Sequence, residues 1–444
     1  CTMIVNDFLS VKLSAQMLCD FEGGKYYTLP LNASVFVNNG ATVEDKTPAD
    51  AEPVAGQPSN CYMINAAKTY SFDATVIGNG DAGIIADAGF HTTSASIDPK
   101  SAKLMWEDSE GFISGVSLVK GKVHFTAEKN VGNAMIAVFD GAGTVLWSWH
   151  IWGVGDTMPG DEEVSSQATI SANSTLKVRY TVMDRTLGAL SKTSYFTTLY
   201  QWGRKDPIPN STVYYVDGQA AGIEKTYPVH KPGSAADATI LTSIQHPECI
   251  IDDYKGQAGD WLASDKTNKY NLLWGDANTT YVFNKSKPAA GKGWTNGKTI
   301  YDPCPYGYHM PPQDVWTNFT TITTAYNTGN IAGYNVVAAD KYNQTNESTG
   351  FTDGNFEVWG RRFFTTGDAE AADAGNVAFY PAAGYRYGSD GHVRYVGWAC
   401  YVWSASPYSA TSQHGGFLDT RSSWVGPVSS PNRSDAFPVR CVQD

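Results

Sequence analysis

Cysteine, histidine and serine most often carry nucleophilic or metal chemistry, and their spacing in this chain favours neither. The seven cysteines of the 444-residue chain form no Cys-x-x-Cys pair and no Cys/His set with zinc spacing. The eight histidines form no His-x-x-x-His motif, and no Gly-x-Ser-x-Gly motif occurs. We therefore predict no metal, no cofactor and no enzymatic activity. A dispersed Ser/His/Asp triad, or a glycosidase using two of the 44 acidic residues, stays open as an alternative.

The composition indicates a turn-rich, mainly β protein of about two to four domains. Aromatic residues make up 13% and charged residues 17% of the chain, beside 43 glycines and 21 prolines, which excludes a disordered chain, a collagen or a coiled coil. The net charge is −12 and the basic residues are scattered, so we expect no nucleic-acid partner. No apolar run approaches the roughly 18 residues of a transmembrane segment, so any membrane attachment is covalent or indirect.

The first 45 residues are expected to form N-terminal strands rather than a complete domain. Alternating apolar and polar residues predict strands over 8–18 and 26–37, and an isolated strand pair is marginal in water. Residues 1–45 are therefore interpreted as part of an incomplete sheet with an open edge. Residues 46–60, rich in proline and charge, are typical of an exposed linker. Cys1 is either the lipid-bearing cysteine of a lipoprotein or the start of a fragment.

Residues 61–155 show the pattern of an immunoglobulin-like β-sandwich. Short strand patterns recur there, with Lys120-Gly121 and Asp140-Gly141 as turn signals. The predicted strands cover 61–64, 70–72, 102–106, 116–119, 122–125, 134–138 and 145–152. The tryptophans of the last strand are interpreted as core residues rather than as a ligand platform.

A polar connector over 156–168 leads to a C-terminal domain over 169–444, for which we expect an α+β fold with long loops. Pro311-Pro312 precede a segment that predicts a short helix near Asp314. Asp252-Asp253 and Asp390-Gly391 stand in turn contexts and are interpreted as turn residues rather than metal ligands.

Two sets of motifs carry a resemblance to known families. One set, at 60–64, 104–108, 132–138 and in the Trp-Ser-Trp-His-Ile-Trp string over 147–152, resembles a sandwich module of large surface and fimbrial tip proteins of Bacteroidetes. The other set consists of six ordered motifs, at 182–189, 200–207, 301–311, 379–386, 401–406 and 437–442. In order and content these motifs are similar to the major paralogous domain first described from Fibrobacter, which resembles the C-type-lectin-like fold.

The resemblance implies a disulfide, a location and a function. In C-type-lectin-like domains a disulfide joins the segment before the helix, here the one predicted near Asp314, to the last strand. The resemblance therefore implies a disulfide between Cys304 and Cys441. Such a bond implies an oxidising compartment, hence export. The chain would be a non-enzymatic cell-surface protein, namely a fimbrial tip adhesin-like subunit with other fimbrial or outer-membrane subunits as partners. The alternatives are a surface lipoprotein that captures polysaccharide for nutrient uptake, and a secreted hydrolase or formylglycine-type enzyme.

The candidate binding residues lie in the region that corresponds to the variable loops of lectin-like folds. We predict that these residues bind a glycan or protein ligand: Tyr387, His392, Arg394, Tyr395, Trp398, Tyr408 and Trp424. The calcium-binding strings Glu-Pro-Asn and Trp-Asn-Asp of sugar-binding lectins are absent. Asp156-Thr157-Met158 resembles an O-glycosylation acceptor of Bacteroidetes, so Thr157 is either modified or an ordinary linker threonine.

Overall fold

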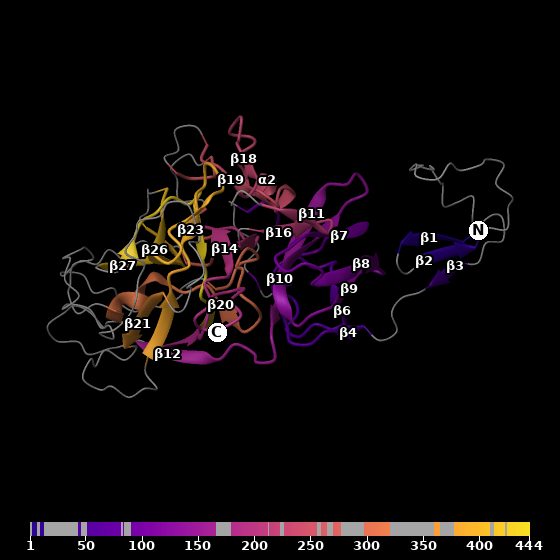
Figure 1. Cartoon of the computed structure of the whole chain (residues 1–444). Coiled ribbons are helices and arrows are strands. Elements are labelled where there is room, and N and C mark those ends of the chain that lie inside the picture. Colours follow the sequence, from indigo (N-terminus) through magenta and orange to yellow (C-terminus); the bar gives the residue numbers. More distant parts are fainter. Residues whose placement is uncertain are drawn as a thin grey trace.

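The computed structural model in Figure 1 shows a mainly β protein, as the composition predicts. It describes residues 2–6, 9–12, 43–45, 51–80, 83, 90–165, 179–211, 213–222, 226–254, 259–263, 270–276, 297–319, 359–364, 377–408, 413–421 and 424–444. Within these ranges the strands form several sheets, and the single α-helix is the short α2 (Ile240–Gln245), capped by the Thr239 side chain. None of the helices in these ranges has the length and apolar character needed to cross a bilayer.

The N-terminal residues form a small antiparallel sheet. Its strands are β1 (Thr2–Asn6), β2 (Leu9–Lys12) and β3 (Val43–Asp45), in the order β1-β2-β3. Strand β2 falls within the strand predicted over 8–18. The strand predicted over 26–37 and the candidate lipidation site Cys1 lie outside the described residues.

All seven strands predicted over 61–155 are present, and they belong to two packed sheets. The smaller sheet has the order β4-β6-β9-β8, and the larger one contains β7, β10, β11 and β5 side by side. The strands are β4 (Glu52–Pro53), β5 (Cys61–Ile64), β6 (Thr69–Asp73), β7 (Ser101–Glu107), β8 (Ile113–Val119), β9 (Lys122–Ala127), β10 (Val131–Phe139) and β11 (Val145–Val154). The rings of Phe72 and Trp149, one from each sheet, meet in the core with centroids 5.0 Å apart.

Turn chemistry fixes the register of these strands. Lys120 and Gly121 have φ of +51° and +78°, the left-handed pair that a two-residue hairpin between β8 and β9 requires. Asp140 accepts hydrogen bonds from the N–H groups of Ala142 and Thr144, each at 2.8 Å, in the turn between β10 and β11. Both turn predictions are therefore confirmed.

The prediction of an exposed linker over 46–60 holds only in part for the described residues 51–60, since Glu52 and Pro53 are exposed but form a strand, and the segment ends in a buried loop. Strand β4 pairs in parallel with β6, and Val54 and Asn60 are buried. The Asn60 amide group donates to the carbonyls of Ile300 and Asp302 at 2.7 and 2.8 Å, and its oxygen accepts from Trp147 Nε1 at 3.0 Å. Small polar residues and prolines suit a solvated linker, but they also suit a buried loop whose polar groups all find partners.

The expected connector over 156–168 contains a strand. Strand β12 (Asp161–Ser165) pairs along its whole length with β13 (Arg179–Met183). Its charged residues suggest a solvated segment, but Glu162 reaches the buried Arg440 in an ion pair of 2.5 Å. The partner of this acid lies far along the chain, which is why local composition does not reveal the strand.

The C-terminal region is built from several small sheets. Two larger ones have the orders β12-β13-β29-β20 and β15-β14-β28-β23-β24, and a third has the order β25-β26-β27. Their strands are β14 (Thr198–Gln201), β15 (Ile208–Pro209), β20 (Tyr308–His309), β23 (Tyr385–Arg386), β24 (Val393–Arg394), β25 (Ala399–Pro407), β26 (Gly415–Arg421), β27 (Trp424–Ser429), β28 (Ala436–Pro438) and β29 (Val442–Gln443). Two strand pairs complete the region: β18 (Val229–His230) with β19 (Ile250–Ile251), and β21 (Gly360–Phe364) with β22 (Val377–Pro381).

The helix predicted near Asp314 is present as a 3-10 helix, η3 (Gln313–Phe319). It follows the two prolines, as expected, and buries Val315 and Trp316. The resemblance of the whole region to C-type-lectin-like domains stays a prediction.

The sandwich and the C-terminal region share one sheet and one core. The hairpin of β16 (Tyr214–Val216) and β17 (Gln219–Ala221) adds to the edge of β7, giving the order β17-β16-β7-β10-β11-β5. A single apolar cluster includes Trp149 of the sandwich with Trp202 and Trp403 of the C-terminal region. Strand β11 is consequently covered on both faces, and this explains its density of tryptophan.

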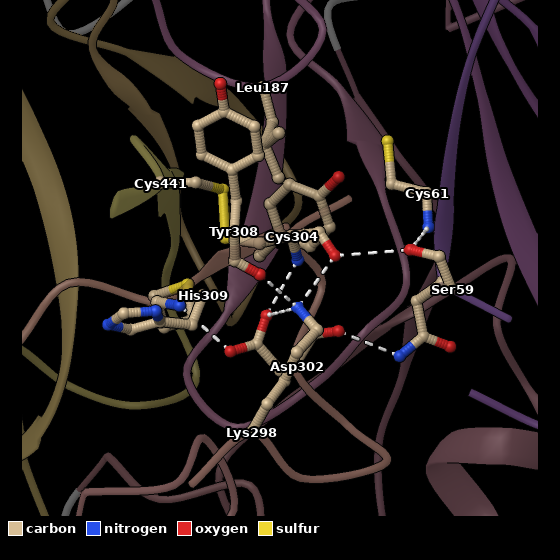
Figure 2. The surroundings of a disulfide bond; sticks show 12 residues. Ser59, Cys61, Leu187, Lys298, Asp302, Cys304, Tyr308, His309 and Cys441 are labelled. Carbon is tan, nitrogen blue, oxygen red and sulfur yellow. Dashed lines mark hydrogen bonds and ion pairs between the residues drawn. A yellow bond between two sulfur atoms is a disulfide. The ribbon is translucent and has the colours of Figure 1, made fainter. Parts of the chain in front are cut away.

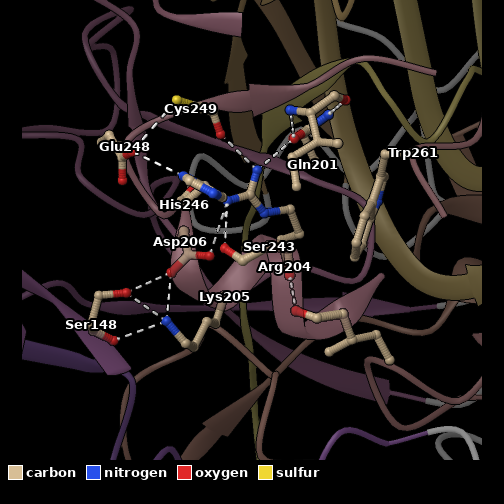
Figure 3. A network of polar contacts seen from close by, with 12 residues as sticks. Ser148, Gln201, Arg204, Lys205, Asp206, Ser243, His246, Glu248, Cys249 and Trp261 are labelled. Carbon is tan, nitrogen blue, oxygen red and sulfur yellow. Dashed lines mark hydrogen bonds and ion pairs between the residues drawn. The ribbon is translucent and has the colours of Figure 1, made fainter. Parts of the chain in front are cut away.

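A buried ionic network also crosses this junction, as Figure 3 shows. Asp206 accepts from the Ser148 hydroxyl of β11 at 2.6 Å and pairs with Lys205 at 2.5 Å and Arg204 at 3.2 Å. Lys205 also donates to Ser148 and lies 4.4 Å above the ring of Trp147. All three charged side chains are at most 2% exposed, so their charges are compensated by one another and by backbone carbonyls.

The predicted disulfide joins Cys304 and Cys441 (Figure 2). It closes a sequence separation of 137 residues, between the segment that leads into β20 and the residue that precedes β29. Lys298 stabilises the segment around Cys304. Its ammonium group pairs with Asp302 at 2.8 Å and donates to the carbonyls of Cys304 and Tyr308.

Replacing Cys304 and Cys441 together by alanine should lower the free energy of unfolding by about 4–5 kcal/mol, because a long loop is then no longer closed in the unfolded chain. Urea denaturation measures the change. Reductant should lower the melting temperature of the wild type and leave the double variant unchanged. Rapid alkylation of either cysteine in the native, unreduced protein would contradict the pairing.

Asp206→Ala should lower the free energy of unfolding by about 3–5 kcal/mol, because it leaves the buried cations Arg204 and Lys205 without their acidic partner. Asp98→Ala is the matched control: Asp98 pairs with Lys100 at the surface and is 85% exposed, so its loss should cost about 0–1 kcal/mol. Chemical denaturation of both variants tests the difference. Equal effects would show that the network does not hold the junction together.

Candidate functional site

Three of the predicted binding residues, Tyr387, His392 and Arg394, lie on the hairpin of β23 and β24. In its turn, Asp390 accepts a hydrogen bond from the His392 N–H at 2.9 Å. Gly391, at φ +69°, donates its N–H to the Tyr387 carbonyl at 2.9 Å. The interpretation of Asp390-Gly391 as turn residues is therefore confirmed, and the turn fixes the direction of both flanking side chains.

Arg394 is held between an acid and an aromatic ring. Its guanidinium lies 2.5 Å from the Asp390 carboxylate and 4.0 Å from the centre of the Tyr387 ring. The side chain is 27% exposed, so the cation retains contact with solvent while it stacks. Arg394 and Tyr387 thus present a fixed, flat pair beside the exposed His392.

The turn that follows β24 positions two further predicted residues, Tyr395 and Trp398. Tyr395 has φ +60°, a left-handed conformation that is unfavourable for a tyrosine. Its carbonyl accepts from the N–H groups of Trp398 and Ala399, both at 3.0 Å, and its ring lies 4.6 Å from the Trp398 ring. Backbone strain of this kind is concentrated at functional sites.

Arg421 completes this surface and the buried Asp419 holds it in place, and neither residue is among those predicted from the sequence. The Arg421 guanidinium lies 4.8 Å from the centre of the Trp398 ring and is held by two hydrogen bonds to Asp419, at 3.0 and 2.8 Å. The two residues are two positions apart on β26, so they share a face of the strand. The two-residue spacing of an acid and an arginine is visible in the sequence, but the contact of Arg421 with Trp398, which places the pair at this surface, is not.

Tyr385 links the pair of Arg394 and Tyr387 to the group of Tyr395, Trp398 and Arg421. Its hydroxyl accepts a hydrogen bond from Arg394. Its ring lies 5.5 Å from the ring of Tyr395 and 5.5 Å from that of the buried Tyr401. We call the connected set the aromatic surface; it consists of Tyr385, Tyr387, Arg394, Tyr395, Trp398 and Arg421.

The structure brings together five of the seven predicted residues and separates one. Those that meet are Tyr387, His392, Arg394, Tyr395 and Trp398. Trp424 begins β27 directly opposite Arg421 in the strand register, which places its backbone at the edge of the aromatic surface. Tyr408 follows the far end of β25, whose first residue directly follows Trp398, and its N–H donates to the His414 carbonyl.

Two buried carboxyl groups lie beneath this surface. Burial raises the pKa of Asp419 to about 6, an effect that Arg421 partly offsets. Burial also raises the pKa of Asp435 to about 7, with the Gly388 N–H and Arg394 opposing the shift and nearby acids reinforcing it. The protonation of Asp435 therefore changes near neutral pH, next to the hairpin that carries Arg394.

A buried Cys–His cluster in the sandwich looks like a nucleophile but is not arranged as one. Cys61 Sγ lies 3.4 Å from His150 Nδ1, and His150 Nε2 lies 2.9 Å from the Asn133 amide oxygen. Burial raises the pKa of the Cys61 thiol and lowers that of His150 to about 3, so both are neutral. Cys61 and His150 are each 1% exposed, so this cluster acts in packing.

Within the described part of the chain, no three His, Cys, Asp or Glu side chains converge as metal ligands. The expectation of a protein without metal or cofactor stays a prediction. Thr157 is exposed between β11 and β12, so its side chain is accessible, and its O-glycosylation stays a prediction as well.

Comparison of the chain with family models, with curated proteins and with solved structures found no match. Any function assigned to the protein must therefore come from its own residues.

Asp435→Asn should raise the free energy of unfolding by about 1–4 kcal/mol near pH 8. The folded pKa of about 7 exceeds the ordinary value of 3.8, so the stabilisation by protonated Asp435 is complete below that ordinary value and is lost as the pH rises through about 7. Asparagine keeps the acceptor for the Gly388 N–H, which lies 2.9 Å away. Denaturation between about pH 5 and pH 8 should show a flatter profile for the variant. An unchanged profile, matching that of the exposed-site control Asp98→Asn, would contradict the shift.

Proposed function

We propose that this protein is an exported, non-enzymatic binding protein that holds a glycan through the aromatic surface. The observation that carries the proposal is the stacking of Arg394 on Tyr387 and of Arg421 on Trp398, joined through Tyr385 and Tyr395. A protein ligand engaged by the same side chains is the alternative occupant.

The physical basis is the amphipathic character of a sugar. Its C–H face packs on aromatic rings, and its hydroxyl groups exchange hydrogen bonds with guanidinium and carboxylate groups. Arg421 is 34% exposed and is fixed by Asp419 before any ligand arrives, so little side-chain entropy is lost on binding. A binding site whose side chains are already fixed in the free protein binds more tightly, because less conformational entropy is lost when the ligand binds.

Export is supported by the disulfide between Cys304 and Cys441, because such bonds persist in oxidising compartments. The resemblance of the sequence motifs to surface and fimbrial tip proteins of Bacteroidetes supports a place at the cell surface, with fimbrial or outer-membrane subunits as partners. Presence of the protein at the end of purified fibres tests this setting. The non-enzymatic character is supported by the neutral, buried state of Cys61 and His150.

Trp398→Ala should weaken glycan binding by about 1–2 kcal/mol, or roughly five- to thirtyfold in the dissociation constant, because the ring supplies the stacking face. A glycan array probed with the whole protein identifies the ligand, and calorimetry then measures the variant. Tyr306→Ala is the matched control, because Tyr306 is 63% exposed and is not part of the aromatic surface. Glycan binding that survives unchanged in Trp398→Ala would place the site elsewhere.

A further inference from the structure

The aromatic surface carries one guanidinium group at each of its two ends. At the hairpin end, the Arg394 guanidinium lies 4.0 Å from the centre of the Tyr387 ring. At the strand end, the Arg421 guanidinium lies 4.8 Å from the centre of the Trp398 ring. Arg394 belongs to β24 and Arg421 to β26, which are strands of two different sheets. The packing of these sheets therefore fixes the separation of the two polar groups.

Three rings lead from one guanidinium group to the other. The Tyr385 hydroxyl accepts from Arg394, and the Tyr385 ring lies 5.5 Å from that of Tyr395. The Tyr395 ring lies 4.6 Å from the Trp398 ring, on which Arg421 stacks. Among the described residues, no ring contact joins Tyr385 directly to Trp398. The rings therefore follow one another in a row instead of surrounding a single point.

The row is accessible to solvent and is supported from below. Its four aromatic residues are half-buried, and the side chains of Arg394 and Arg421 are 27% and 34% exposed. The buried Tyr401 contacts the row at two places, since its ring lies 5.5 Å from the Tyr385 ring and 5.8 Å from the Arg421 guanidinium. A ligand therefore meets a row of side chains that is already in place.

A single sugar is too small to use the whole row. A pyranose ring is about as wide as one aromatic ring, so the sugar that packs its C–H face on Tyr395 and Trp398 covers only the middle of the row. Contact with both guanidinium groups requires one more sugar on each side of it. The hydroxyl and ring oxygens of these outer sugars accept hydrogen bonds from Arg394 and Arg421.

We propose that the aromatic surface binds a linear glycan lengthwise, over at least three consecutive sugar residues, with Arg394 and Arg421 engaged at the same time. This inference rests on the proposed function and adds the class of ligand to it, namely a stretch of a chain instead of a single terminal sugar. Because the three sugars are covalently joined, the second and third contacts cost little further translational freedom.

Calorimetric titration of the whole protein with cello-, malto-, xylo-, manno- and chito-oligosaccharides of one to six residues tests the length. In at least one series the affinity should rise by about two- to tenfold for each residue added, up to three residues, because each one gains an aromatic or charge-assisted contact. The affinity should level off once the row is filled.

Variants at two positions separate lengthwise binding from binding at one point. Tyr387→Ala removes the ring beneath Arg394 and should weaken binding of the trisaccharide and longer chains by about two- to tenfold. It should leave monosaccharide binding, which is centred on Trp398, unchanged. Trp398→Ala should weaken binding at every length, and Tyr306→Ala, an exposed tyrosine outside the aromatic surface, should change none. Melting temperatures show whether each variant is folded.

The lengthwise site is overturned if the monosaccharide binds within about twofold of the trisaccharide in every series that binds. It is also overturned if Tyr387→Ala weakens all lengths equally or weakens none. In both cases sugar binding persists, so the proposed function stands without the lengthwise site. If no glycan binds, either in these series or on the glycan array, the proposed function fails and the lengthwise site fails with it.

Discussion

Asp206 is the acid on which the union of the sandwich and the C-terminal region depends. It lies between two cations that its own segment supplies and a serine of β11, with almost no access to water. Each charge is tolerable only because the others are in place, so the arrangement specifies one way of docking β11 against the segment after β14. The shared sheet and the tryptophan core around it then have a single register to adopt.

The sandwich was largely predictable because its information is local. Strands β5 to β11 follow from alternation, and the Lys120-Gly121 turn follows from the preference of hairpins for left-handed residues. The segments that contain Asn60 and β12 were predicted to be a linker and a connector because their information is not local: the polar groups of each find their partners far along the chain. Pairing of Tyr215 with Glu107, which extends the larger sheet, is likewise non-local and leaves no pattern in either segment.

The candidate site divides in the same way. Tyr387 to Trp398 could be found because aromatic and charged residues gather in one short, turn-rich stretch, whereas Arg421 acquires its role only by crossing from β26 to Trp398. The register of β7 against β10 likewise contains a single extra residue, Met105, whose presence in β7 changes which side chains share a face. A one-residue irregularity of this kind is invisible to a search for periodicity.

The placement of the last strands has a consequence for the order of assembly during synthesis. Strand β28 lies inside one sheet, between β14 and β23, and β29 lies inside another, between β13 and β20. Both sheets remain open while the ribosome makes the preceding residues, and only the stretch Ala436–Gln443 can close them. The C-terminal region must therefore fold after its translation, whereas the sandwich core, apart from the added hairpin, can form much earlier.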